Sequence, residues 1–186
     1  MSVKSDLRKK LISKRKNIKS KTEKDNNICN NLLNSKIYIE CKQILIFASL
    51  SDEINTDFLI KQSLNEQKKV ALPKCLDSNG NMEFFYIDSI SDLKCGAFNV
   101  REPVPDNSTL VTDFSCALCV VPALSYDKNG FRIGYGKGYY DRFLEKFSSI
   151  SVGLCYNELI SDEIPADKYD LPVDYIVTED GIICCQ

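Results

Sequence analysis

Residues 115–121 read SCALCVV, and this stretch decides the fold class. Its apolar side chains occupy consecutive positions, so a strand formed here is apolar on both of its faces. A second run of the same character, KQILIFA, lies at residues 42–48. Strands buried on both faces are typical of the centre of a parallel sheet that helices cover on both sides. The two runs therefore predict the central strands of an α/β sheet.

The segments around these two runs alternate between strand and helix patterns. Further strands are expected at residues 70–72, 82–87, 150–154 and 175–177, the first of them ended by Pro73. Helices are expected in the N-terminal segment, after caps at Thr22 and Thr56, and over about 138–147. Residues 88–114 are rich in turn-forming residues and are expected to form a loop. We interpret residues 1–186 as a single α/β domain with a largely parallel sheet covered by helices.

The composition excludes several classes of protein. The longest apolar run is nine residues, Cys116 to Leu124, whereas about 20 are needed to cross a bilayer, so no membrane span is expected. The N-terminus is charged where a signal peptide is apolar, so export is not expected. Histidine is absent, which excludes Ser-His-Asp triads, Cys-His pairs and HExxH zinc sites.

The cysteines point to a reducing environment. There are nine, an odd number, and Cys116 and Cys119 form the only CxxC pair. A redox or metal role for that pair is the alternative to buried thiols that act as small apolar residues. We expect the second, and with it a cytoplasmic location.

Positive charge is concentrated in residues 1–24, which carry a net charge of +8, whereas the remainder of the chain carries −10. Apolar residues at near-helical spacing predict a helix here, namely Val3, Leu7, Leu11 and Ile18. Lys4 and Arg8 lie four residues apart and can grip one anion together. Five later basic residues are expected to be mostly solvated: Lys14, Arg15, Lys16, Lys19 and Lys21. Without interleaved aromatic residues, a platform for single-stranded nucleic acid is poorly supported.

Candidate chemistry is concentrated in residues 129–143, NGFRIGYGKGYYDRF. Gly134, Gly136 and Gly138 alternate between a strand and a helix, where backbone amides can approach a phosphate. Arg132 and Lys137 add full positive charges beside the glycines. Asp141 follows in the first helical turn, where a carboxylate can hold magnesium against the same phosphates.

The standard phosphate-binding motifs do not match this segment. A Walker A loop requires Gly at the position of Phe131 and Ser or Thr at the position of Gly138. The GxGxxG pattern fails because the third glycine comes one residue early. Spacing alone therefore leaves two alternatives open, an anion site and an ordinary glycine-rich turn.

The whole chain resembles the 5-formyltetrahydrofolate cyclo-ligase family, also called the methenyltetrahydrofolate synthetases. The segments that carry the resemblance, in matching order and spacing, are KSDLR (4–8), FASLSDEINT (47–56), LPK (72–74), VPALSYDKNGFRIGYGKGYYDRFL (121–144) and IPADKYDLPVDYIVTE (164–179). The resemblance implies a NagB/RpiA/CoA-transferase-like α/β fold. It also implies an enzyme that uses ATP and magnesium to convert 5-formyltetrahydrofolate, polyglutamylated or not, to 5,10-methenyltetrahydrofolate, ADP and phosphate. We separately expect a monomer, although the sequence does not give the oligomeric state.

The implied mechanism agrees with a chain that has no histidine. A formyl amide is a poor electrophile because its nitrogen lone pair is delocalised, and phosphorylating its oxygen creates a leaving group. A second folate nitrogen then attacks, closes the ring and expels phosphate. This chemistry depends on positioning and charge neutralisation more than on an imidazole base.

The resemblance also implies roles for individual residues. ATP contacts are expected at Lys4, Arg8, Arg132, Ile133, Gly134, Tyr135, Gly136, Lys137, Gly138, Tyr139 and Tyr140. Lys137 is expected to face the γ-phosphate, with Arg132, Tyr139 and Tyr140 also in catalytic positions. Magnesium ligands are expected at Asp141 and Asp170. Folate contacts are expected at Ala48, Glu53, Phe98, Tyr139 and Tyr140, with the Glu53 carboxylate accepting hydrogen bonds from the pterin.

Two residues depart from the family pattern. Tyr135 stands where a basic residue is common, which removes one phosphate charge, and Cys75 stands where some members carry a tyrosine. Both departures affect the expected affinity more than the reaction type. Two further functions stay open at this point: a nucleic-acid-binding protein that uses the basic N-terminal segment, and a sugar-phosphate or acyl-CoA enzyme of the same fold. The acidic remainder of the chain argues against nucleic acid.

Overall fold

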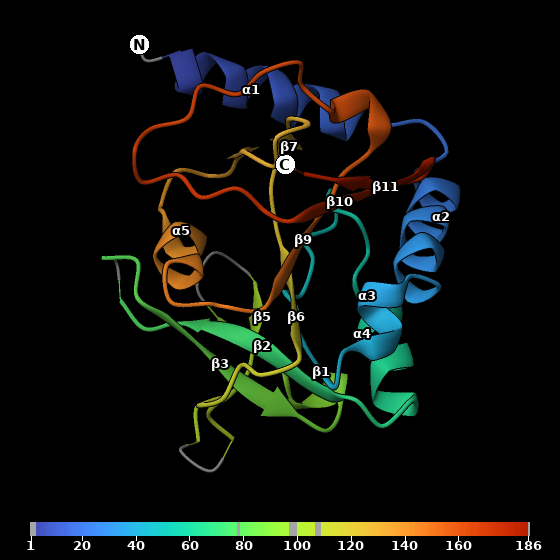
Figure 1. Ribbon diagram of the computed structural model, residues 1–186, viewed down its shortest axis with the longest axis vertical. Helices are drawn as coiled ribbons and strands as arrows, with labels where there is room; N and C mark the ends of the chain where they lie inside the picture. The colour runs from blue at the N-terminus through green and yellow to red at the C-terminus, as the bar shows by residue number, and fades with distance from the viewer. Residues whose placement is uncertain (1–2, 78, 97–99, 107–108, 186) are drawn as a thin grey trace.

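The centre of the computed structural model, which describes residues 3–77, 79–96, 100–106 and 109–185, is a seven-stranded sheet (Figure 1). Its strands are β1 (Gln43–Leu45), β2 (Lys69–Cys75), β3 (Met82–Ile87), β6 (Ala117–Val121), β9 (Ile150–Leu154), β10 (Tyr175–Thr178) and β11 (Gly181–Cys184). They are ordered β11-β10-β9-β6-β1-β2-β3. The five inner strands are parallel, and only β3 and β11, at the two edges, are antiparallel to their neighbours. The predicted α/β class is confirmed.

The two decisive runs form the middle of this sheet. β1 and β6 are neighbours, with Ile44 opposite Leu118, and both of these side chains are fully buried. Every residue of the two strands is buried, because helices cover both faces of the sheet.

The helices lie on both faces and across one end of the sheet (Figure 1). They are α1 (Val3–Lys16), α2 (Lys21–Leu33), α3 (Lys36–Glu40), α4 (Asp57–Asn65) and α5 (Tyr139–Leu144), with 3₁₀ turns η1 (Ile90–Asp92) and η3 (Asn157–Leu159). α2, α3 and α4 cover one face and α5 covers the other, where the Phe143 ring centroid lies 4.7 Å from that of Phe84. No helix in the described residues is both long enough and apolar enough to span a membrane.

α1 crosses the end of the sheet at which the parallel strands finish (Figure 1). Its predicted apolar stripe is confirmed for Leu11, which is buried, and for Leu7, which is partly buried. Ile18 also packs on the core, although it lies beyond the end of the helix. The side chain of Val3 is outside the described part of the structure.

Several predicted boundaries are wrong, each for a physical reason. β2 continues through Pro73, because β1 pairs with β2 only as far as Ala71 and the missing N–H of the proline faces no partner strand there. Residues 88–114 contain short ordered elements, including a small sheet of β4 (Lys94–Cys95) and β5 (Arg101–Glu102). α5 ends at Leu144 rather than near residue 147.

The predicted helix caps also need correction. α2 begins at Lys21 after Ser20, so Thr22 lies inside the helix and is not its cap. Thr56 does precede α4, but its hydroxyl donates to the Phe47 carbonyl at 2.7 Å instead of capping. Thr56 therefore anchors the loop that follows β1.

The cysteines are free thiols throughout the described residues. Four are buried, as expected: Cys29, Cys41, Cys119 and Cys155. The prediction of buried thiols is wrong for three others, because Cys95, Cys116 and Cys184 are exposed. Within the described residues no group of three or more Cys, Asp or Glu side chains is arranged to hold a metal, so the CxxC pair has no metal partners there.

Candidate functional site

The candidate site lies where the direction of strand order reverses. From β1 the chain adds β2 and β3 on one side of the sheet, and β6, β9 and β10 on the other. In open α/β sheets such a reversal leaves a crevice at the carboxyl ends of the two strands, and ligands bind there. Residues 46–56 follow β1, and the glycine segment follows β6, so the two predicted binding segments meet at this crevice.

The glycine segment extends from a small hairpin, β7 (Ser125–Tyr126) and β8 (Arg132–Ile133), to the start of α5. Gly136 and Gly138 have φ of +87° and +70°, a left-handed conformation that favours glycine. A Cβ at Gly136 would also lie 3.1 Å from the Arg8 guanidinium. The backbone conformation therefore favours glycine at 136 and 138, and the close approach of Arg8 from α1 is a second reason for glycine at 136.

Three cations of the predicted ATP site differ in what they contact. Arg8 Nε donates to the Gly134 carbonyl at 2.8 Å, which ties α1 to the glycine segment. Arg132 is almost fully buried and donates to Asp141 Oδ1 at 2.6 Å and to the Leu171 carbonyl at 2.7 Å. The Lys137 side chain is exposed and makes no hydrogen bond or ion pair with any described residue. Lys137 is thus a charge available to a ligand.

Lys4 contacts the segment that carries Asp170. Its Nζ lies 2.6 Å from both Asp167 Oδ2 and Asp170 Oδ2. Burial raises the pKa of Asp170, but the Asp167 amide and the Lys4 ammonium outweigh it, so the net pKa is below its usual value. Lys4 therefore has its partners at residues 167 and 170, and Arg8 has its partner at Gly134. Binding of one anion by both side chains together stays a prediction.

The chain fold brings the two predicted magnesium ligands to one side of the site. The Leu171 amide donates to Asp141 Oδ1 at 3.4 Å, so the residue that follows Asp170 contacts Asp141 directly. Asp141 Oδ2 and Asp170 Oδ1 accept no hydrogen bond from any described residue. Hard carboxylate oxygens with one free atom each suit Mg²⁺, which takes one or two protein carboxylates and completes its shell with phosphate and water.

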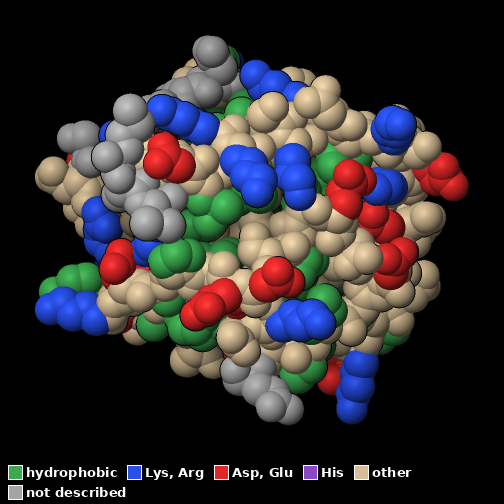
Figure 2. Space-filling model, turned by 90° about the horizontal axis from the view of Figure 1, so that it is seen from above, with side chains coloured by type: hydrophobic (Ala, Val, Ile, Leu, Met, Phe, Trp, Pro, Cys, Tyr) green, Lys and Arg blue, Asp and Glu red, His purple; other side chains and the backbone are tan. Residues whose placement is uncertain are grey.

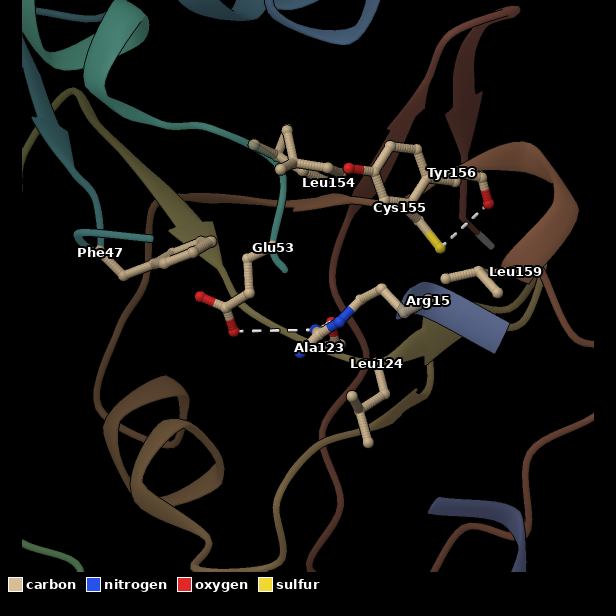
Figure 3. Close-up of a pocket in the computed structure, with 10 residues that line it drawn as sticks. Arg15, Phe47, Glu53, Ala123, Leu124, Leu154, Cys155, Tyr156 and Leu159 are labelled. Carbon is tan, nitrogen blue, oxygen red and sulfur yellow. Dashed lines mark hydrogen bonds and ion pairs between the residues drawn. The ribbon is translucent and has the colours of Figure 1, made fainter. Parts of the chain in front are cut away.

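The predicted folate segment is more buried than an open binding loop. Ala48 and Glu53 are 2% and 7% exposed. Glu53 Oε2 accepts from the Leu50 amide at 2.9 Å, and burial raises the pKa of Glu53. Its other oxygen lies 3.8 Å from Arg15 Nη1, and the two side chains point toward each other across a cavity of about 20 Å³, enough for one water (Figure 3).

A wider polar groove of about 420 Å³ adjoins Glu53 on the α2 side. Its charged side chains are paired within the protein, Lys21 with Asp25 at 2.6 Å and Arg101 with Asp57 at 2.5 Å. The groove is large enough for part of an organic ligand. Both of these cations are paired with a carboxylate, so the groove offers an anion no unpaired Lys or Arg among its lining residues.

The two predicted tyrosines have different environments. Tyr139 donates its hydroxyl to the Asp77 carbonyl at 2.6 Å. The ring of Tyr140 is partly exposed, but its hydroxyl is enclosed and has no hydrogen-bond partner among the described residues. Burial raises the pKa of Tyr140, and nearby groups that add to this include Glu53 and Cys75. An enclosed hydroxyl without a partner leaves a position for a polar ligand atom. The predicted folate contact Phe98 lies outside the described residues.

The expectation for the later basic residues is wrong at Arg15. Its side chain is 3% exposed, with Nε and Nη2 at 3.2 and 2.8 Å from Asp52 Oδ2 and Nη2 at 2.5 Å from the Tyr135 hydroxyl. The sequence does contain a signal, because Leu7, Leu11 and Arg15 follow one another at four-residue spacing and so share the buried face of α1.

The other basic residues of this segment are closer to expectation. Lys14, Lys16 and Lys19 are exposed, and Lys21 pairs with Asp25. Figure 2 shows the molecule from above Figure 1, the side on which α1 lies, and its basic side chains are interspersed with acidic ones. The face shown carries no continuous basic surface of the kind that nucleic-acid-binding proteins present.

The comparison with known proteins agrees with this geometry. The model of the 5-formyltetrahydrofolate cyclo-ligase family matches residues 1–179. The chain belongs to this family. It is 29% identical to the 5-formyltetrahydrofolate cyclo-ligase of Mus musculus, over 77% of this chain and 76% of the mouse protein.

Solved structures of cyclo-ligases share the fold. The NMR structure of Aquifex aeolicus 5,10-methenyltetrahydrofolate synthetase is 29% identical and superposes with a TM-score of 0.86, covering 100% of this chain and 94% of that chain. The synthetase from Mycoplasma pneumoniae, 24% identical, covers 96% of this chain and 99% of its own with a TM-score of 0.71. The cyclo-ligase family consists of ATP-dependent ligases, and none of these relatives supports a nucleic-acid-binding or sugar-phosphate function.

Proposed function

We propose that this protein converts 5-formyltetrahydrofolate and ATP to 5,10-methenyltetrahydrofolate, ADP and phosphate, with the formyl oxygen leaving as part of the phosphate. The observation that carries the proposal is the meeting of two segments at the crevice between β1 and β6. One segment presents Lys137 as an exposed cation, and the other presents the buried carboxylate of Glu53. Family membership and the superposition with a synthetase support the same reaction.

The glycine segment, residues 132–140, is the proposed ATP site. Gly134, Gly136 and Gly138 bring the backbone close to the phosphates, with Ile133 and Tyr135 between them. Arg8 holds the segment through the Gly134 carbonyl and Lys4 holds the facing segment through Asp170, so α1 closes over the nucleotide. Lys137 neutralises charge that develops on the transferring phosphoryl group.

Asp141 and Asp170 are the proposed magnesium ligands. Bound magnesium would neutralise the ATP phosphates. Arg132 fixes one oxygen of Asp141 and Lys4 fixes one oxygen of Asp170, which leaves one free oxygen on each. These two cations also keep the carboxylates close together before the metal binds, since each offsets a negative charge.

The folate is proposed to bind between the segment after β1 and the start of α5. Glu53 accepts hydrogen bonds from the pterin, and Ala48 forms an apolar wall beside it. The enclosed hydroxyl of Tyr140 donates to the formyl group, while Tyr139 lies on the outer side of the substrate. Phe98, which is outside the described residues, stays a proposed folate contact on the strength of the family resemblance alone. Exclusion of water from this region favours attack by the second folate nitrogen over hydrolysis of the phosphorylated intermediate.

The direct test is incubation of the purified protein with ATP, magnesium and 5-formyltetrahydrofolate. The ultraviolet absorption of the methenyl product should increase only when all three are present, with one ADP formed per product. ATP hydrolysis that does not depend on folate, or no product at all, would refute the proposal.

The remaining properties are proposed from surface and composition. The most exposed large apolar side chains of the described residues, Ile39, Tyr169 and Val104, lie in α3 and in two loops far apart in the sequence, which supports a monomer. The net negative charge of the chain beyond residue 24 supports a protein that binds no nucleic acid. Free thiols throughout the described residues support a reducing cytoplasmic location. The substrate is proposed to include polyglutamylated 5-formyltetrahydrofolate, with its tail in solvent.

A further inference from the structure

Arg15 is the one basic residue of the N-terminal segment whose side chain is buried in the described structure. Its guanidinium reaches three separate segments. It contacts Asp52 and Glu53 in the segment after β1, the Ala123 carbonyl after β6 at 3.4 Å, and the Tyr135 hydroxyl in the glycine segment. All three segments are distant from Arg15 along the chain, since Asp52, Ala123 and Tyr135 lie 37, 108 and 120 positions away.

The chemistry of these contacts requires arginine. Two nitrogens donate to one oxygen of Asp52, one of them also donates to Tyr135, and the third faces Ala123 and Glu53. Only a planar group with several fixed donors satisfies acceptors in these different directions, whereas a lysine ammonium is a single compact charge. A buried charge is retained only when its partners compensate for lost hydration.

The residues that Arg15 contacts belong to the proposed binding segments of two different substrates. Tyr135 lies between Gly134 and Gly136 of the proposed ATP segment, and Glu53 is the proposed pterin acceptor. Tyr135 is 52% exposed, and its hydroxyl accepts from Arg15, a second polar contact between α1 and this segment besides the one from Arg8 to the Gly134 carbonyl. The Arg15 guanidinium also lies 5.8 Å from the Tyr135 ring centroid, within the range of a cation–π contact.

We infer that Arg15 is a positioning residue that holds the ATP segment through Tyr135 and the proposed folate-binding segment through Asp52 and Glu53. The inference rests on the proposed function and adds one residue that serves both substrates without contacting either. The inference also gives Tyr135 a role at a position where a basic residue is common in the family. Its hydroxyl accepts a hydrogen bond from Arg15 and so brings the Arg15 guanidinium next to the glycine segment.

The test is a double-mutant cycle in steady-state kinetics. Arg15→Lys keeps the charge and removes the planar guanidinium with its several donors, and Tyr135→Phe removes only the hydroxyl. We expect Arg15→Lys to raise the KM for both ATP and folate at least about fivefold, and Tyr135→Phe to raise only the KM for ATP. In the double variant the two effects on ATP should not multiply, because Arg15 acts on ATP through Tyr135. The control is Lys16→Gln, an exposed neighbour on α1, which should change neither constant by twofold.

A purely structural role predicts a different result. Loss of folded protein lowers kcat and leaves both KM values unchanged, and that outcome would overturn the inference. Independent, multiplying effects of the two substitutions on ATP would overturn it as well. If Arg15→Lys does not fold, the binding of a non-hydrolysable ATP analogue to Tyr135→Phe tests the inference. An unchanged dissociation constant would show that the hydrogen bond between Arg15 and Tyr135 does not position the ATP segment. Absence of turnover in the unaltered protein would instead refute the proposed function, and the binding measurement on Tyr135→Phe would still decide the role of Tyr135.

Discussion

Replacing Lys137 by alanine removes the one charge of the glycine segment that has no partner among the described residues. Arg8 is bound to the Gly134 carbonyl and Arg132 to Asp141, so neither can take the place of Lys137 without leaving its own partner. Removing a single charge aimed at a transition state costs about 3 to 4 kcal/mol, which corresponds to a loss of about 100- to 1000-fold in kcat.

The same substitution should leave the fold intact. Lys137 is exposed, and substitutions at exposed surface positions change stability by about 0.5 kcal/mol or less. The melting temperature should therefore move by only about 1 to 2 °C for a chain of this size. The KM for ATP should rise less than kcat falls, since the charge acts mainly on the transferring group.

The assay is formation of the methenyl product at saturating ATP and magnesium, with the melting temperature measured on the same samples. Lys137→Arg should recover part of the rate because it restores the charge with a different shape. Lys146→Ala, at another exposed lysine close by in sequence, is the matched control and should retain full rate. A kcat for Lys137→Ala within about threefold of the unaltered enzyme would refute the assignment of Lys137.

Three further predictions concern the remaining parts of the site. Asp141→Asn and Asp170→Asn should each raise the magnesium concentration needed for half-maximal rate, and an unchanged magnesium titration in both would exclude them as ligands. Deleting residues 1–8 should raise the KM for ATP several-fold with a smaller effect on folate, which steady-state kinetics would show, because Lys4 and Arg8 hold the nucleotide side. For Glu53, burial raises the pKa, so the KM for folate should increase in mildly acidic buffer, as the carboxyl gains a proton before an ordinary glutamate would. Glu53→Gln should raise the KM for folate at neutral pH and remove this pH dependence; a variant that retains it would show that another group titrates.

The central strands could be predicted because the apolar pattern of their own residues indicates burial on both faces. Residues 118–121 and 44–45 are apolar at every position, and only a strand covered on both faces accommodates that pattern. Edge strands carry a weaker signal, and β11 was not predicted, since Ile182 is exposed and the strand pairs along only one side. The continuation of β2 through Pro73 depends on where β1 ends, which is a property of the neighbouring strand.

The candidate site could be predicted as a set of residues but not as a set of contacts. The spacing of the glycines and of Asp141 is local, so it appears directly in the chain. The partners of Lys4 and Arg15 lie far along the sequence, and nothing near either residue identifies them. Arg15 illustrates the error that follows: net charge suggested a solvated side chain, whereas its position on the apolar face of α1 indicated burial.

The placement of α1 has a consequence for how the protein is made. This helix is synthesised before its long-range polar partners, which include Ala123, Tyr135 and Asp170. A nascent chain therefore carries the apolar stripe of α1 exposed until most of the polypeptide has emerged, and the final docking closes loops of more than 100 residues, a slow class of contact. Assembly of the nucleotide side of the crevice is consequently a late event in biosynthesis, and shortened chains that lack the segment around Asp170 lose a partner of α1.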